Sequence, residues 1–388
     1  MASTSRSGGG RGGVSRTLSW RERFLIACGP GPLAGVTTAD WLGLLRENQF
    51  AIDSPYLFRA ASISWCAVTN SLFRWCDDRR FGRAVRDAVV HPPLFVLGHW
   101  RSGTTHLHYL LARDARFAFP NFYQCCYPHT FLSTERHFSA LPAFLLPERR
   151  PYDEVRTDLK VPQEDEFALA VSCFLSPYVS GVFPRRAAHY DRFLTFRDAS
   201  DREIARWKAA LWAFVRKLTV KHGKPLILKS PAHTGRIKLL LEMFPDAKFV
   251  HIHRDPYAVF SSSVHTYLTG LPWGRLQDTS HFDWAGRIVR QYKELYDAFF
   301  EQRALIPPGH FHEVCYEELE RDPVGEVRKL YAALGLPAFD GAEPALRRYV
   351  ASLGGYRKNE FPPLPPDQRR RIATEWQRCF QEWGYPTN

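Results

Sequence analysis

Three basic side chains, Arg101, Lys229 and Arg254, each come at or shortly after the end of a short apolar run. Fixed cations that meet at one place favour a phosphate or sulfate group and stabilise negative charge that develops during group transfer. Their sequence separation is large, so they form one site only if the elements that carry them place the run ends side by side.

The apolar runs are typical of buried strands of a parallel sheet. Helical spacing of Leu and Phe follows each of them, and strands that alternate with helices favour a parallel sheet with crossover helices. In such sheets ligands bind beyond the carboxyl ends of the strands, where the three cations lie. We therefore expect an α/β fold with a P-loop-like parallel sheet flanked by helices, in a single large domain with a helical N-terminal region and insertions. The predicted strands are Leu94–Leu97, Leu226–Leu228 and Lys248–Ile252.

The chain of 388 residues divides into three predicted parts. Residues 1–16 are rich in Ser, Gly and Arg and contain no acid, which is typical of a disordered basic tail. Residues 17–90 carry Trp, Leu and Phe at helical spacings and predict a helical N-terminal region packed on the core. Residues 91–388 hold the strands and form the predicted α/β domain.

The turn after the first strand has the glycine spacing of a phosphate-binding loop. Gly98 and Gly103 are separated by four residues, and Thr104 and Thr105 open the next helix. Backbone amides at a helix N-terminus and nearby hydroxyls can hold a phosphate. Thr104 stands where nucleoside-triphosphate enzymes have a lysine, and Arg101 places a cation inside the loop instead. A P-loop nucleotide kinase or NTPase is the alternative interpretation, and it predicts the lysine that is missing here.

The segment Arg101-Ser-Gly-Thr-Thr105 resembles the 5′-phosphosulfate loop of sulfotransferases that use 3′-phosphoadenosine 5′-phosphosulfate (PAPS). Arg254 with Ser262, eight positions later, is similar to the pair that holds the donor's 3′-phosphate in this family. The similarity spans roughly residues 94–360 and is weak over about 117–200. The donor-binding residues that it implies are Arg101, Ser102, Gly103, Thr104, Thr105, Arg254, Ser262, Tyr316, Arg357 and Lys358, of which Tyr316 would lie near the adenine. Asn359 follows Lys358 where the family has glycine.

Sulfuryl transfer needs cations for the leaving phosphate and a base for the acceptor hydroxyl. The resemblance makes Arg101 and Lys229 the candidates for the cations, and no divalent metal is required. His233 resembles the family's catalytic histidine, so Arg101, Lys229 and His233 are the predicted catalytic residues. Other sulfotransferases use a glutamate as the general base, so an acid of a short acidic run is a second candidate for the base. The same acids are also explained as residues that favour the start of a helix. The alternatives are Glu164, Asp165 and Glu166 and, with less support, His106, His108 and His129.

The acceptor is the least determined part of the reaction. Aromatic residues are dense between Phe117 and Phe131, and Phe167–Phe183 is largely apolar. Such residues form core more often than pocket, but a pocket lined by them favours a hydrophobic alcohol, phenol or lipid. We expect a small-molecule or lipid-like acceptor. The net charge of +12 also suits nucleic acid, but cations at separate strand ends fit one compact ligand better.

Eight scattered cysteines contain no metal-ligand spacing and are typical of buried thiols in a reducing compartment. The longest apolar window has 17 residues and includes Ser, Pro and Gly, so no integral membrane span is expected. We therefore expect a cytoplasmic enzyme. Its oligomeric state has no signature in the sequence.

Overall fold

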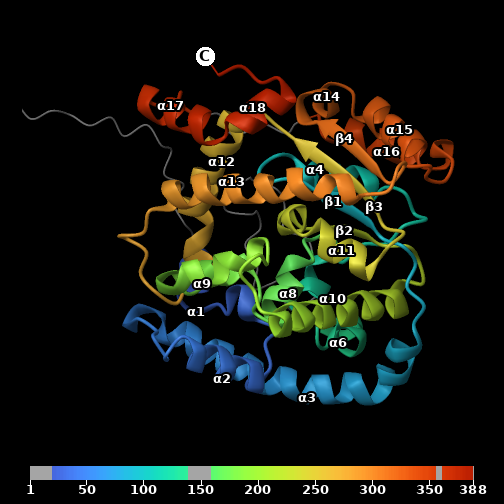
Figure 1. Cartoon of the computed structure of the whole chain (residues 1–388). Coiled ribbons are helices and arrows are strands. Elements are labelled where there is room, and N and C mark those ends of the chain that lie inside the picture. The colour runs from blue at the N-terminus through green and yellow to red at the C-terminus, as the bar shows by residue number, and fades with distance from the viewer. Residues whose placement is uncertain (1–19, 139–158, 355–360, 388) are drawn as a thin grey trace, which may run out of the picture.

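The structure is a computed structural model, and it describes residues 20–138, 159–354 and 361–387 (Figure 1). The described residues form a sheet of four parallel strands in the order β2-β1-β3-β4. This confirms the predicted α/β fold with a parallel sheet. The second strand lies one residue later than predicted because Val96 pairs with Lys229. The strands are β1 (Leu94–Leu97), β2 (Ile227–Lys229), β3 (Lys248–His253) and β4 (Phe311–Cys315).

Helices surround the sheet and supply most of the chain's secondary structure (Figure 1). The N-terminal ones are α1 (Trp20–Cys28), α2 (Thr38–Glu47) and α3 (Leu57–Asp87). Between β1 and β2 lie α4 (Thr104–Leu111), α5 (Phe122–Cys126), α6 (Phe131–Phe138), α8 (Glu166–Ser172), α9 (Ala187–Asp191) and α10 (Asp201–His222). Then come α11 (Ile237–Met243), α12 (Pro256–Gly270), α13 (Trp284–Gln302), α14 (Tyr316–Arg321), α15 (Pro323–Ala333), α16 (Glu343–Ser352), α17 (Pro366–Glu375) and α18 (Gln377–Trp383).

Local sequence signals explain where the long crossover helix α10 begins and ends. Ser200 and Glu203 form a capping box, in which each side chain accepts a hydrogen bond from the other residue's backbone amide. Gly223 ends the helix in the left-handed conformation. These signals place the amino end of β2 soon after the helix, and so fix where Lys229 emerges from the sheet.

The sheet separates two hydrophobic clusters because successive strand residues point to opposite faces. Phe95 packs against Phe244 and Phe249 in the larger cluster, which also contains Phe299 of α13. Val96 packs on the other face with residues of α4 and α15, such as Leu107 and Leu330. Every residue of β1 is buried, so the loop that follows it starts from a fixed position.

The first three helices form a layer at the lower side of the molecule in Figure 1. Trp41 of α2 and Ile63 of α3 belong to the same buried cluster as Phe95 of the sheet. Residues 1–16, the predicted basic tail, lie outside the described residues, and the division at residue 90 stays a prediction. No helix among the described residues has the length and apolar content to cross a membrane.

Candidate active site

The loop between β1 and α4 is built from backbone conformations that few residues adopt. Gly98, Arg101 and Gly103 have positive φ angles of 138°, 71° and 100°. The amide and the hydroxyl of Ser102 both donate to the carbonyl of His99, at 3.1 and 2.8 Å, and close the turn. A Cβ on Gly98 would lie 2.5 Å from the carbonyl oxygen of Ile252, so the loop needs glycine there. The turn brings the N-terminus of α4 to the end of β1.

Helix α4 begins at Thr104 and presents its first-turn amides to this loop. These amides have no partner within the helix, and together with the helix dipole they favour an anion. The hydroxyl of Thr105 lies 3.4 Å from Nζ of Lys229, the last residue of β2. The structure therefore brings the loop predicted to bind phosphate together with the predicted catalytic lysine.

The second group of predicted donor-binding residues gathers on the other side of the same loop. Nε of Arg101 donates to Oγ of Ser262 on α12 at 2.9 Å, and Arg254 donates to the carbonyl of Arg101 at 3.2 Å. The Arg254 guanidinium lies over the ring of Tyr316, 4.3 Å from its centroid. That ring also approaches Gly103, where an added Cβ would meet Cδ2 of Tyr316 at 2.3 Å. Five predicted residues from four segments thus share one location.

Lys229 is the centre of a polar network, and the sequence predicted only some of its members. Its Nζ lies 2.5 Å from Oε1 of Glu164, and Oε2 of Glu164 accepts a hydrogen bond from the hydroxyl of Tyr178. That hydroxyl accepts one from the indole nitrogen of Trp100 at 2.8 Å. Burial, followed by the charge of Glu164, raises the pKa of Tyr178 well above its usual value, so its hydroxyl remains a donor. The network joins the loop to an acid about 60 residues away.

The other two acids of the run also face basic residues that follow β2. Asp165 Oδ2 lies 2.5 Å from Nε2 of His233, and both side chains are 0% exposed. Glu166 accepts hydrogen bonds from both terminal nitrogens of Arg236, at 2.7 and 3.0 Å, and this pair is buried as well. Glu164 differs because 14% of its side chain is exposed. Three consecutive acids therefore pair with three basic residues, and Glu164 is the member that reaches solvent.

Sequence reasoning missed Trp100, Tyr178 and Arg236. Trp100 stood inside the recognised loop and Tyr178 inside the apolar window, but neither carries a charge that marks it. A signal existed for Arg236, because Lys229, His233 and Arg236 recur at intervals of four and three residues opposite a run of three acids. Such a match of basic and acidic residues could have suggested a set of ion pairs.

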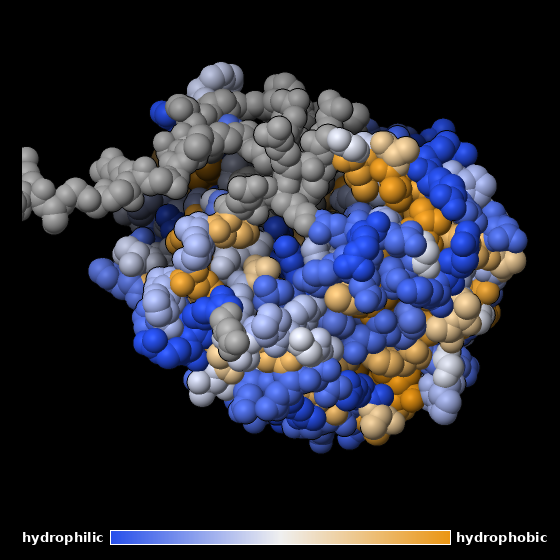
Figure 2. Space-filling view, turned by 90° about the horizontal axis from the view of Figure 1, so that it is seen from above, coloured by the Kyte–Doolittle hydropathy of each residue, from blue (hydrophilic) through white to orange (hydrophobic). Residues whose placement is uncertain are grey.

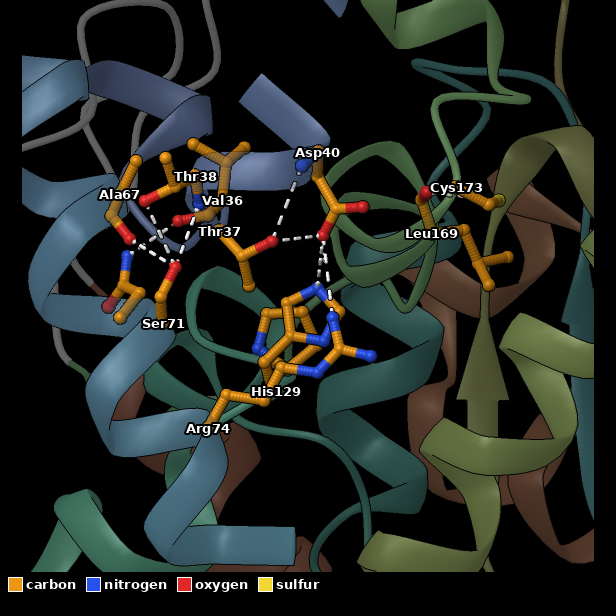
Figure 3. Close-up of polar contacts among 12 residues, drawn as sticks. Val36, Thr37, Thr38, Asp40, Ala67, Ser71, Arg74, His129, Leu169 and Cys173 are labelled. Atoms are coloured by element: carbon orange, nitrogen blue, oxygen red, sulfur yellow. Dashed lines mark hydrogen bonds and ion pairs between the residues drawn. The ribbon is translucent and has the colours of Figure 1, made fainter. Parts of the chain in front are cut away.

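The remaining predicted residues are three near the C-terminal end of the similarity and three histidines. Arg357, Lys358 and Asn359 fall outside the described residues. His106 is half-buried on α4, whereas His108 is fully buried and burial lowers its pKa well below the usual value. His129 lies beside Asp40 of α2, as Figure 3 shows, and burial lowers its pKa to about 3.

Two further features bear on the chemistry. Within the described ranges, no three His, Cys, Asp or Glu side chains are grouped so that they could hold a metal ion. All eight cysteines are free thiols, and burial raises the pKa of Cys126 and Cys173 to about 12. These two thiols are therefore poor nucleophiles at neutral pH.

Comparison with known proteins identifies the family of the chain. Residues 92–341 match the model of the sulfotransferase family. The omega-hydroxy-beta-dihydromenaquinone-9 sulfotransferases Stf3 of Mycobacterium bovis and Mycobacterium tuberculosis are each 37% identical over 373 residues, 96% of this chain and 94% of theirs.

Solved structures show the same fold at lower identity. Sulfotransferase STF9 from Mycobacterium avium aligns with a TM-score of 0.69 at 20% identity, covering 90% of this chain and 96% of its own. STF1 from Mycobacterium tuberculosis aligns with a TM-score of 0.63 at 19% identity, covering 87% and 91%. The comparisons give no support to the kinase alternative. The chain belongs to the sulfotransferase family and is a sulfotransferase enzyme.

Proposed function

We propose that this enzyme moves the sulfuryl group of PAPS to the hydroxyl of a hydrophobic, lipid-like acceptor. The donor assignment rests on one observation: hydrogen bonds join Arg101, Arg254 and Ser262 beside the N-terminus of α4. A ligand with two separate anionic groups fits these two neighbouring anion sites better than a single phosphate does. The acceptor class is supported by the relatives named for a menaquinone that bears an omega-hydroxyl group.

The donor would be held from both sides of the loop. Ser102, Thr104, Thr105 and the first amides of α4 would bind the 5′-phosphosulfate. Arg254, Ser262 and Arg101 would bind the 3′-phosphate, with Arg357 and Lys358 completing that side. Tyr316 would pack near the adenine, which its place between Gly103 and Arg254 supports.

We assign the general base to Glu164 in preference to His233. A base must lie within hydrogen-bond reach of the acceptor hydroxyl. Glu164 reaches solvent beside Lys229 and Thr105, whereas His233 is fully enclosed and faces Asp165. Each carboxylate oxygen has more than one lone pair, so Glu164 can accept the acceptor's proton while Tyr178 and Lys229 hold it in place.

In this mechanism the acceptor hydroxyl gives its proton to Glu164 as its oxygen forms a bond to sulfur. The bond between sulfur and the bridging phosphate oxygen breaks, and the leaving phosphate keeps the electron pair. Lys229 lies between Glu164 and Thr105 and supplies positive charge at that position. Because Arg101 bonds to Ser262, we place its charge on the 3′-phosphate side. Binding and alignment supply most of the remaining acceleration.

The donor assignment is tested by calorimetric titration with 3′-phosphoadenosine 5′-phosphate. We expect the wild type to bind and Arg254→Ala to weaken binding at least about tenfold, which corresponds to the loss of one charge-assisted contact. Arg290→Ala, an exposed arginine on α13, is the matched control and should bind as the wild type does. Absence of wild-type binding, or equal binding of ATP with Mg²⁺, would remove the donor assignment.

The base assignment is tested by transfer of labelled sulfate from PAPS to a hydroxylated menaquinone. We expect Glu164→Gln to lower kcat by about 10²–10⁴-fold with unchanged affinity for 3′-phosphoadenosine 5′-phosphate, because only proton transfer is lost. His233→Gln, checked for folding by circular dichroism, should keep far more turnover. The reverse pattern would make His233 the base. A wild type that binds donor but does not use this acceptor would overturn the acceptor class alone.

We also assign the enzyme to the cytoplasm. All eight cysteines are free, and Cys125, Cys173 and Cys379 are buried. Unpaired thiols at this number are typical of a reducing compartment.

A further inference from the structure

Helix α3 carries a continuous apolar stripe on its outer side. Phe58, Trp65, Val68, Leu72 and Trp75 have exposed fractions between 58% and 76%. Their intervals of seven, three, four and three residues place them along one side of a helix. Single exposed apolar residues are ordinary on protein surfaces, but a contiguous row of large ones marks an interaction site.

The inner side of α3 combines small apolar residues with polar ones that bond to other elements. Asn70 donates to the carbonyls of Ala34 and Val36 at 2.7 and 3.0 Å. Figure 3 shows this contact region, where α3 also reaches Thr38 and Asp40 of α2 through Ser71 and Arg74. Asp77 pairs with the buried Lys217 of α10 at 2.5 Å. Specific hydrogen bonds and ion pairs hold α3 in place, and its largest apolar side chains remain outside.

The apolar stripe continues into a basic one on the same side of the helix. Arg79, Arg83 and Arg86 follow Trp75 at intervals of four, four and three residues, and all three are exposed. None of the ion pairs found among the described residues includes any of them. The Arg79 guanidinium lies 5.3 Å from the centre of the Trp75 ring. Aromatic side chains and unneutralised cations thus share one helix side.

Helix α1 adds to the same layer. Its Trp20 and Phe24 are exposed, and Arg59 of α3 holds the end of α1 by donating to the carbonyls of Ile26 and Gly29. The opposite face of the molecule, seen from above in Figure 2, is hydrophilic over most of its coloured surface, with scattered hydrophobic patches. The row of exposed aromatic residues lies on the α1–α3 layer.

We propose that the outer side of α3 docks on the surface of a membrane that contains anionic phospholipid. Trp and Phe side chains bind at the boundary between headgroups and acyl chains, and arginines bind the lipid phosphates. Charge decides against a second copy of this chain, because a copy would bring the same three arginines to the contact. The inference rests on α3 and goes beyond the proposed reaction, although it would place the enzyme where a lipid acceptor resides.

The test is cosedimentation of the full-length enzyme with vesicles of phosphatidylcholine alone or with 30% phosphatidylglycerol. We expect binding to the anionic vesicles to be at least about tenfold stronger, since basic residues near such a surface are attracted to the anionic headgroups. Trp65→Ser/Trp75→Ser should weaken this binding at least about tenfold. Arg79→Gln/Arg83→Gln/Arg86→Gln should abolish the preference for the anionic vesicles.

The controls change an exposed apolar residue and three exposed arginines outside α3. Leu305→Ser removes an exposed apolar side chain, and Arg290→Gln/Arg370→Gln/Arg371→Gln removes three exposed arginines. All variants should melt normally and bind 3′-phosphoadenosine 5′-phosphate as the wild type does, which separates docking from the proposed reaction. Absence of wild-type binding to anionic vesicles would overturn the proposal. So would a wild-type dimer in sedimentation equilibrium that Trp65→Ser/Trp75→Ser dissociates.

Discussion

The basic residues shortly after β1 and β3 and those at or after the end of β2 have the same chemistry but different surroundings. Arg101 donates to the hydroxyl of Ser262, and Arg254 donates to the carbonyl of Arg101 and lies over the ring of Tyr316. Lys229, His233 and Arg236 each face a carboxylate of the run 164–166. A basic residue near a strand end is therefore not by itself a ligand-binding residue, and its partner decides its role.

The largest difference between the two regions is expected in stability. Arg236→Met would leave Glu166 buried without its cation, which costs about 3–5 kcal/mol. Arg254→Ala removes a half-buried side chain with one backbone hydrogen bond and one contact with the Tyr316 ring, and should change the free energy of unfolding by only about 1 kcal/mol. Urea unfolding of both variants checks this.

A double variant sharpens that prediction. Arg236→Met/Glu166→Gln removes both charges, so it should recover part of the stability that Arg236→Met loses. Equal destabilisation by Arg236→Met and Arg254→Ala would contradict the comparison, because it would mean that both arginines are structural.

A smaller effect is expected from the glycine that joins the donor loop to Tyr316. Gly103→Ala combines a positive φ of 100° with a Cβ placed 2.3 Å from the Tyr316 ring. Gly309→Ala is the matched control, with a φ of 78° and no atom within 4 Å. The control should cost about 1 kcal/mol in stability, and Gly103→Ala about 1–3 kcal/mol more.

Only Gly103→Ala should also weaken binding of 3′-phosphoadenosine 5′-phosphate, because it moves Tyr316 and the start of α4. Thermal melts and titrations of both variants measure these effects. Equal loss in the two variants would show that the loop does not depend on its contact with Tyr316.

The position of the loop that we propose binds the donor could be predicted because its signals are local. A buried apolar run, a glycine turn and a helix start lie within 20 residues around Gly98, and each has its own sequence pattern. The parallel order of strands follows from their alternation with helices. The placement of Arg101, Lys229 and Arg254 at one edge of the sheet could therefore be predicted from the sequence.

The pairings of the acidic run could not be predicted in the same way. Glu164 meets Lys229 across 65 residues, and which acid of the run stays exposed depends on how α8 packs against the segment after β2. Likewise, the sequence predicts that α3 is helical but not which side faces inward. Polar residues lie on its inner side because Asn70 and Asp77 find partners in distant elements.

The smallest expected effect is a dependence of stability on pH that comes from the donor side. Burial lowers the pKa of His99 in the loop to about 4, against a usual value of about 6.5. Between these values the unfolded chain binds a proton that the folded chain does not, so stability is full above pH 6.5 and falls as the pH drops towards 4. The loss is on the order of 1 kcal/mol per pH unit for one such histidine.

His99→Asn isolates this contribution, because the asparagine amide can replace the ring nitrogen that contacts the carbonyl of Trp100 at 2.7 Å. Carboxylates that titrate in the same range are common to both proteins and cancel in the difference. Urea unfolding at pH 7 and pH 5 should therefore show a smaller loss for the variant than for the wild type. An equal loss would mean that His99 is already protonated in the folded enzyme at pH 5, and the donor loop would then carry an additional positive charge at that pH.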